Sequence, residues 1–96
     1  MRRLYIIMYD IADDKRLRLV FRIMRGYGDH LQYSVFRCEL SRREKFEMIG
    51  ELEEVIHHQE DQVLLVPLGP ARGDTERSIE ALGKPYTLLE RHAIVV

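Results

Sequence analysis

The chain has 96 residues, of which 46% are hydrophobic and 32% charged, with a formal net charge of -1. This length and composition predict one globular domain over residues 1–96 and exclude a disordered chain. The longest apolar runs, residues 4–8 and 63–68, are far shorter than the roughly 20 residues of a membrane helix. Cys38 is the single cysteine and permits no internal disulfide, so we expect a cytoplasmic protein without a secretory signal.

An apolar run that ends on a carboxylate opens the chain. Residues 4–9 are apolar or aromatic and Asp10 follows them, which predicts a strand over residues 3–10 that is buried on both faces. Asp10 then either caps the next helix or binds a hard cation such as Mg²⁺, with two copies of Asp10 sharing one ion at a dimer axis. Tyr9 is the second candidate catalytic residue, although most tyrosines in such a strand belong to the core.

The clearest helical periodicity comes next. Apolar residues recur at i, i+3, i+4 and i+7 from Leu17, after two aspartates suited to a helix start, and glycines 26 and 28 end the pattern. The opposite face carries a basic stripe of Lys15, Arg16, Arg18, Arg22 and Arg25. Such a stripe is either a solvated face or a phosphate-binding surface. Because like charges at i and i+4 destabilise a helix, we favour nucleic-acid binding.

The remaining elements are predicted in chain order. Residues 30–40 alternate as one long strand or as a hairpin bent near residues 32–34. Ser41 and Glu44 form a capping box for a helix that runs to about His57. Residues 62–68 are predicted to form a strand closed by its prolines, residues 77–83 alternate as an exposed or edge strand would, and the apolar residues 93–96 are expected to join a sheet.

This order of elements predicts an α+β protein. The economical arrangement is the ferredoxin-like βαββαβ sandwich, with both helices on one face of an antiparallel sheet and extra C-terminal strand or strands. The other face of the sheet would need a cover. We therefore expect a homodimer whose sheets pack face to face, with residues about 75–96 forming a C-terminal extension that pairs across the dimer.

Several segments resemble one known family. Tyr9-Asp10-Ile11, the Asp13–Arg16 segment, Gly28–Phe36 with its Gln-Tyr-Ser-Val-Phe end, and Ile79–Pro85 are similar to the second core protein of CRISPR adaptation, the CRISPR-associated protein 2 family. The resemblance covers essentially the whole chain. It implies a ferredoxin-like homodimer in which C-terminal strands of one subunit extend the sheet of the other.

The same resemblance implies a function in antiviral defence. Family members bridge the CRISPR integrase protein and hold the duplex DNA of a new spacer, and some are Mg²⁺-dependent endonucleases on single-stranded RNA or double-stranded DNA. Asp10 matches the aspartate that binds magnesium, Arg16 and Arg18 match the basic start of the first helix, and Phe36 falls in an aromatic position of the family. Many relatives carry a Cys-x-x-Cys pair where this chain has residues 69–72, Gly-Pro-Ala-Arg.

Two functions from different classes follow, and a third remains as the alternative. The chain is expected to be a duplex-binding adaptation subunit, a metal-dependent phosphodiesterase (a nuclease and hydrolase), or both. The alternative is a ferredoxin-like dimeric regulatory protein that binds a small ligand between its sheets without nuclease activity. That alternative predicts a neutral groove without a basic stripe, which the sequence disfavours.

Overall fold

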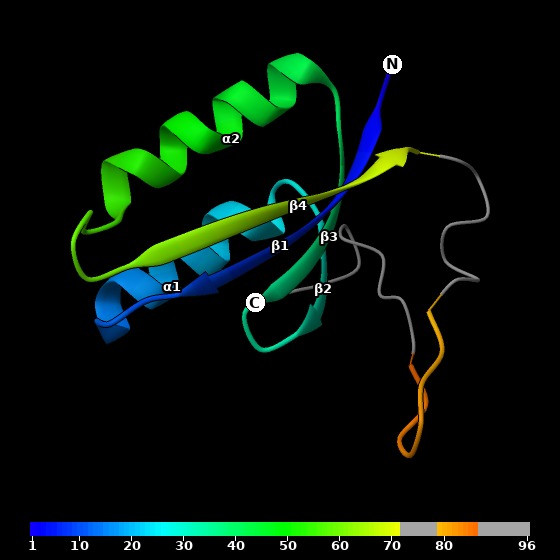
Figure 1. Ribbon diagram of the computed structural model, residues 1–96. Helices are drawn as coiled ribbons and strands as arrows, with labels where there is room; N and C mark the ends of the chain where they lie inside the picture. The colour runs from blue at the N-terminus through cyan, green and yellow to red at the C-terminus, as the bar shows by residue number, and fades with distance from the viewer. Residues whose placement is uncertain (72–78, 87–96) are drawn as a thin grey trace.

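The protein folds as two layers, a sheet and a pair of helices. The computed structural model describes residues 1–71 and 79–86. Its elements are β1 (Arg3–Asp10), α1 (Asp14–Arg25), β2 (Asp29–Gln32), β3 (Val35–Leu40), α2 (Arg42–Val55) and β4 (Gln62–Pro70). This βαββαβ order is that of the ferredoxin-like fold (Figure 1). The predicted strand over residues 3–10 is confirmed.

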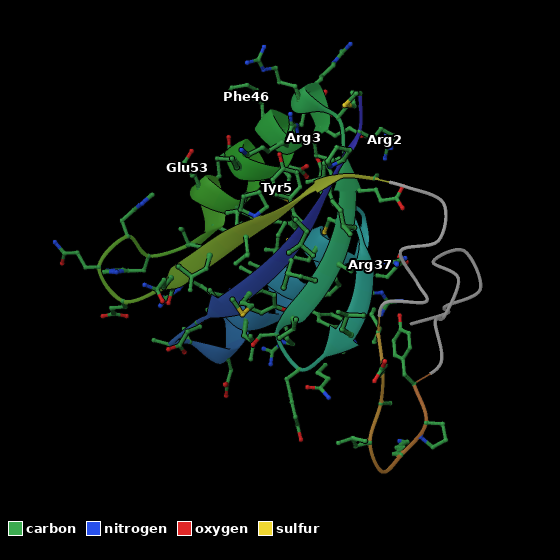
Figure 2. All side chains as sticks on the ribbon, turned by 45° about the vertical axis from the view of Figure 1, so that its right-hand side comes forward. Arg2, Arg3, Tyr5, Arg37, Phe46 and Glu53 are labelled. Carbon is green, nitrogen blue, oxygen red and sulfur yellow. The ribbon has the colours of Figure 1, made fainter. Side chains whose placement is uncertain are left out.

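The four strands form one antiparallel sheet in the order β2-β3-β1-β4. The strand β1 therefore lies in the interior of the sheet, and β2 and β4 are its edges. Both helices lie on the same side of the sheet (Figure 1). Phe46 and Glu53 project from α2 into solvent, on the side of that helix turned away from the sheet (Figure 2).

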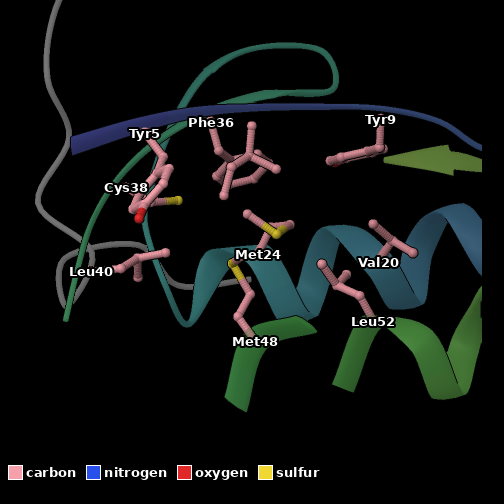
Figure 3. Close-up of a cluster of buried hydrophobic side chains, with 10 residues drawn as sticks. Tyr5, Tyr9, Val20, Met24, Phe36, Cys38, Leu40, Met48 and Leu52 are labelled. Carbon is pink, nitrogen blue, oxygen red and sulfur yellow. The ribbon is translucent and has the colours of Figure 1, made fainter. Parts of the chain in front are cut away.

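The core lies between the sheet and the helices (Figure 3). Alternate residues of β1 and β3 point into it, because successive side chains of a strand face opposite sides. Each helix contributes one apolar stripe. Among the described residues, the largest fully buried side chains are Ile7, Val20, Met24, Phe36, Cys38, Leu40 and Met48. Truncation of one of the larger of these side chains to alanine would cost about 2–5 kcal/mol of stability.

Residues 30–40, for which the sequence did not decide between one long strand and a hairpin, form a hairpin. The chain reverses at Tyr33 and Ser34 between β2 and β3, and the register of the pair shifts between His30 and Gln32. Tyr33 has a positive φ of 31°. The hairpin tip is held by two contacts: the Nε2 of His30 lies 2.6 Å from the carbonyl oxygen of Tyr33, and the backbone N–H of Tyr9 donates to the carbonyl of Ser34 at 3.1 Å.

The predicted capping box of α2 is confirmed. The backbone N–H of Glu44 donates to the Ser41 hydroxyl at 3.1 Å, and the backbone N–H of Ser41 donates to the Glu44 carboxylate at 2.8 Å. These two bonds satisfy amides that the first turn of a helix leaves free. The helix ends at Val55, two residues before the predicted end at His57.

The strand β4 contains both of its prolines and ends at Pro70, two residues beyond the predicted end at Leu68. Pro67 lies opposite Tyr5, next to a register shift between Leu4 and Tyr5. Since β1 is the only described strand that pairs with β4, a residue without a backbone N–H can face the other side of β4 there. An edge position therefore tolerates a proline that a central strand would exclude.

The face of the sheet opposite the helices is apolar and partly exposed. Leu64 and Val66 of β4 are 45% and 38% exposed. Residues 79–86 are described and contain no strand, so the strand predicted over 77–83 is wrong for its described part. The predicted strand at 93–96 lies outside the described residues. Within the described ranges, no helix is long and apolar enough to cross a membrane.

Candidate nucleic-acid and metal site

Asp10 stands at the end of β1 with its carboxylate in solvent. It pairs with Gln62 in the sheet, and three residues separate it from the start of α1. The cap of that helix is Asp13, whose carboxylate accepts the backbone N–H of Arg16 at 2.9 Å. The alternative that Asp10 caps the helix is therefore wrong. In residues 1–71 and 79–86 the Asp10 side chain has no hydrogen bond or ion pair, so both oxygens are available to a ligand.

A buried carboxylate, Asp61, fixes the loop that follows Asp10. The Asp61 side chain is 0% exposed and accepts the backbone N–H groups of Ala12 and His57 at 2.9 and 2.8 Å. The guanidinium of Arg16 donates to the same carboxylate at 2.7 and 3.2 Å, and to Glu60 at 3.2 Å. The hydrogen bonds from Arg16 hold the pKa of the Asp61 carboxyl well below its ordinary range. Asp61 thus ties the start of α1 to the turn before β4.

This arrangement divides the predicted basic stripe. Arg16 is only 24% exposed and has two carboxylate partners, so its guanidinium is committed within the protein. Lys15, Arg18 and Arg22 are exposed, and Arg25 lies with its guanidinium carbon 5.4 Å from the centre of the Phe21 ring. None of these four forms an ion pair with another described residue. The four, and not Arg16, are the cations that α1 offers to an anion.

Tyr9 belongs to the core. Its ring stacks on Phe36 with centroids 6.2 Å apart, and it points to the helix side of the sheet, whereas Asp10 points the other way. Burial raises the pKa of its hydroxyl to about 12. A phenol with this pKa keeps its proton at neutral pH, so Tyr9 is not suited to act as a base, and its catalytic role stays a prediction.

Phe36 is also a core residue, and its prediction as a nucleic-acid contact is corrected. Its side chain is fully buried, with the rings of Phe21 and His30 at centroid distances of 5.6 and 5.0 Å. The alternation of β3 turns Phe36, Cys38 and Leu40 toward the helices, so the ring has no exposed face on which a base could stack.

A groove reaches from Asp10 to three of the free cations of α1. It has a volume of about 710 Å³ and is mainly apolar, and it runs between β1, α1 and the tip of the β2–β3 hairpin. Its lining residues are Tyr9, Asp10, Ile11, Leu17, Arg18, Phe21, Arg22, Arg25, Tyr33 and Ser34. Sequence reasoning missed Tyr33 and Ser34, because it did not decide whether the chain turns there. Three arginines in one groove also disagree with the alternative of a neutral small-ligand site.

One chain does not form a complete metal centre. Among the described residues, no three side chains from His, Cys, Asp and Glu lie close enough to hold an ion together. Mg²⁺ nevertheless accepts one or two carboxylates and keeps several waters. The unpartnered carboxylate of Asp10 fits the role of such a single ligand, and a second copy of the chain would supply another.

Comparisons with known proteins agree with this architecture. The solved structure of Streptococcus pyogenes Cas2 superposes with a TM-score of 0.68 at 27% identity, covering 83% of this chain and 99% of that chain. The "CRISPR-associated endoribonuclease Cas2 1" of Rhodospirillum rubrum is 45% identical over 92 residues, which are 96% of this chain and 89% of the relative. The "CRISPR-associated endoribonuclease Cas2" of Geobacter sulfurreducens is 38% identical over the full length of both chains. The family described as "CRISPR associated protein Cas2" matches residues 1–74. The chain therefore belongs to the Cas2 family.

Proposed function

We propose that this chain is a subunit of CRISPR adaptation that binds the phosphate backbone of nucleic acid through α1 and hydrolyses phosphodiester bonds at Asp10. The observation that carries the proposal is the shared groove. Asp10, whose exposed carboxylate is suited to a hard cation, and three arginines without ion pairs, suited to phosphates, line one groove. Two relatives that match nearly the whole chain are named endoribonucleases, which supports a nuclease.

The chemistry of the site follows from its groups. A magnesium ion held by Asp10 would supply an activated water and neutralise charge that develops on the phosphate. Arg18 and Arg22 would hold the phosphates on either side of the reacting one, because guanidinium groups form paired hydrogen bonds with phosphate oxygens. Asp61 keeps the loop between Asp10 and α1 in place, so the carboxylate and the arginines keep a constant separation.

The homodimer is part of the proposal. The apolar face that Leu64 and Val66 present to solvent needs a cover, and a second sheet packed face to face would supply it. Two copies of Asp10 near the dimer axis would then share one ion. The remaining partners, duplex DNA and the CRISPR integrase protein, are proposed from membership of the family.

Substitution of Asp10 tests the nuclease directly. Asp10→Asn removes a negative charge from the exposed end of β1, so Mg²⁺-dependent cleavage of labelled single-stranded RNA and duplex DNA should be lost while binding is retained. Glu53→Gln is the matched control, because Glu53 is an exposed carboxylate on the outer side of α2 (Figure 2). If Asp10→Asn cleaves as fast as the parent protein, the nuclease proposal is wrong.

A structural measurement tests the shared ion. A crystal structure of the dimer with and without Mg²⁺ gives the distance between the two Asp10 carboxylates. One ion shared by both should bring the carboxylate oxygens to about 4 Å from each other across the metal, since each Mg²⁺–O bond is about 2.1 Å. A separation too wide for one hydrated ion, unchanged by Mg²⁺, would contradict the shared site and leave the DNA-binding role.

A further inference from the structure

The loop that leaves Asp10 is held by a side chain from a distant part of the sequence. Residues 11–13 lie between Asp10 and the first residue of α1. Asp10 pairs with Gln62 in the sheet, and Asp61, the residue before Gln62, accepts the backbone N–H of Ala12 at 2.9 Å. The loop is therefore fixed within two residues of Asp10, from the turn that precedes β4.

Asp61 uses its whole carboxylate for contacts within the protein. One oxygen, Oδ1, accepts from Ala12 and Arg16, and Oδ2 accepts from Arg16 and from the backbone N–H of His57. These hydrogen bonds fill the roughly four acceptor sites of a carboxylate. The side chain is 0% exposed, and Asp61 does not line the groove. Any effect of Asp61 on a reaction must therefore pass through the groups that it holds.

Arg16 joins the same carboxylate to α1. It lies in the first turn of that helix, and its Nε donates to Asp61 at 2.7 Å. Arg18 and Arg22 follow on the same helix and line the groove together with Asp10. Because the backbone hydrogen bonds of a helix connect each residue to the one four positions earlier, a fixed first turn also restrains both of these arginines. Asp61 is thus the common point through which Asp10 and the cations of α1 are aligned.

We propose that Asp61 is a positioning residue for hydrolysis, and that Arg16 acts on the reaction through Asp61 and not through a phosphate. A displacement of about 1 Å at a reacting group can lower a rate by about 100-fold. Binding is less sensitive, because the attraction between arginines and phosphates is electrostatic and does not require alignment with Asp10. Loss of Asp61 should therefore lower turnover and leave affinity unchanged. This inference rests on the proposed function and adds a residue that sets the rate at the same site.

Asp61→Asn tests the inference, because asparagine has the same shape and keeps one oxygen for a backbone N–H but loses the charge that holds Arg16. Single-turnover cleavage of labelled single-stranded RNA at saturating protein in Mg²⁺ should slow by roughly 10- to 100-fold. Fluorescence anisotropy without metal should give an affinity for the same RNA within about twofold of that of the parent. Hydrogen exchange of the Ala12 amide, followed by NMR without metal, should be faster in the variant, because a neutral acceptor binds this N–H less strongly.

A second variant and a control separate positioning from loss of stability. Arg16→Gln leaves both backbone hydrogen bonds of Asp61 in place, so it carries the same test if Asp61→Asn does not fold. The double variant should cleave no more slowly than the slower single variant, since both changes break the same ion pair. Ser41→Ala removes the hydroxyl that caps α2 and leaves the bonds of Asp61 intact, so it should lower the melting temperature and keep the turnover of the parent.

The outcomes distinguish the inference from the proposed function. Cleavage by Asp61→Asn or Arg16→Gln at the rate of the parent would overturn the inference and leave the nuclease in place. The inference is also wrong if Ser41→Ala slows cleavage as much, if RNA affinity falls by the same factor as the rate, or if exchange of the Ala12 amide is unchanged. A parent protein that does not cleave would overturn both the inference and the proposed hydrolysis.

Discussion

The pairing of Arg16 within the protein leads to a quantitative prediction for nucleic-acid binding. Arg18, Arg22 and Arg25 have no described acidic partner, whereas Arg16 is bonded to Asp61. Each phosphate contact contributes about 0.9 to the slope of log affinity against log salt for duplex DNA. Replacement of the three unpaired arginines by glutamine should therefore flatten the slope by about 2.7 for each protomer that contacts the duplex.

This change of slope is readily measurable. Between about 50 and about 200 mM salt, the parent protein should lose roughly 40-fold more affinity than the triple variant for each contacting protomer. Fluorescence anisotropy with a labelled duplex at several salt concentrations gives both slopes. Arg16→Gln is the comparison variant, and we expect it to lower the melting temperature while the slope stays close to that of the parent.

Two outcomes would refute the reasoning. A slope that is unchanged in the triple variant would mean that these three arginines of α1 do not contact phosphates. A slope that Arg16→Gln flattens by as much as Arg22→Gln would mean that the bond to Asp61 opens when nucleic acid binds. In the second case the division of the stripe into paired and unpaired cations would be wrong.

Three further predictions concern stability. Asp61→Asn should lower the melting temperature. The folded state holds the pKa of this carboxyl below its ordinary value of 3.8, so the parent protein should lose stability as the pH falls through and below that value. Thermal melts of Asp61→Asn should not show this loss of stability at low pH. Gly28→Ala should destabilise by about 1–3 kcal/mol or more, because a Cβ there would meet the sulfur of Cys38 and lie 2.5 Å from the carbonyl oxygen of Arg37. Gly50→Ala, in an open position on α2, should instead stabilise by about 1 kcal/mol in urea titrations, and a loss there would contradict the assignment of Gly50 as a helix-interior residue without contacts.

Much of the fold follows from local patterns in the sequence. The bounds of β1, the start of α1 and the capping box of α2 each depend on residues within a few positions of one another, and all three are confirmed. The hairpin remained undecided because Tyr33 takes a φ that its side chain does not favour. The extent of β4 could not be predicted from Pro67 alone, since the effect of a proline depends on whether its strand is an edge.

The candidate site was predictable only in part. The position of Asp10 and the exposure of Arg18 and Arg22 follow from strand and helix periodicity. The partner of Arg16 lies 45 residues away along the chain, and no local signal points to Asp61. Phe36 was wrongly predicted to contact nucleic acid, although the alternation of the strand places it on the same face as Cys38 and Leu40, which indicated the core. Aromatic character alone does not separate a ring that stacks on a ligand from one that packs inside.

The two helices also give the molecule an electric dipole that its net charge of -1 does not reveal. α1 carries a net positive charge and α2 a net negative one, and the two lie next to each other on one side of the sheet. Such a separation produces a dipole that turns the protein as it approaches a polyanion, over distances up to about a Debye length of roughly 8 Å in physiological salt. In the proposed twofold dimer, only the component of this dipole along the symmetry axis would survive. A polyanion would therefore meet the pair from one end of that axis, already oriented before the first contact forms.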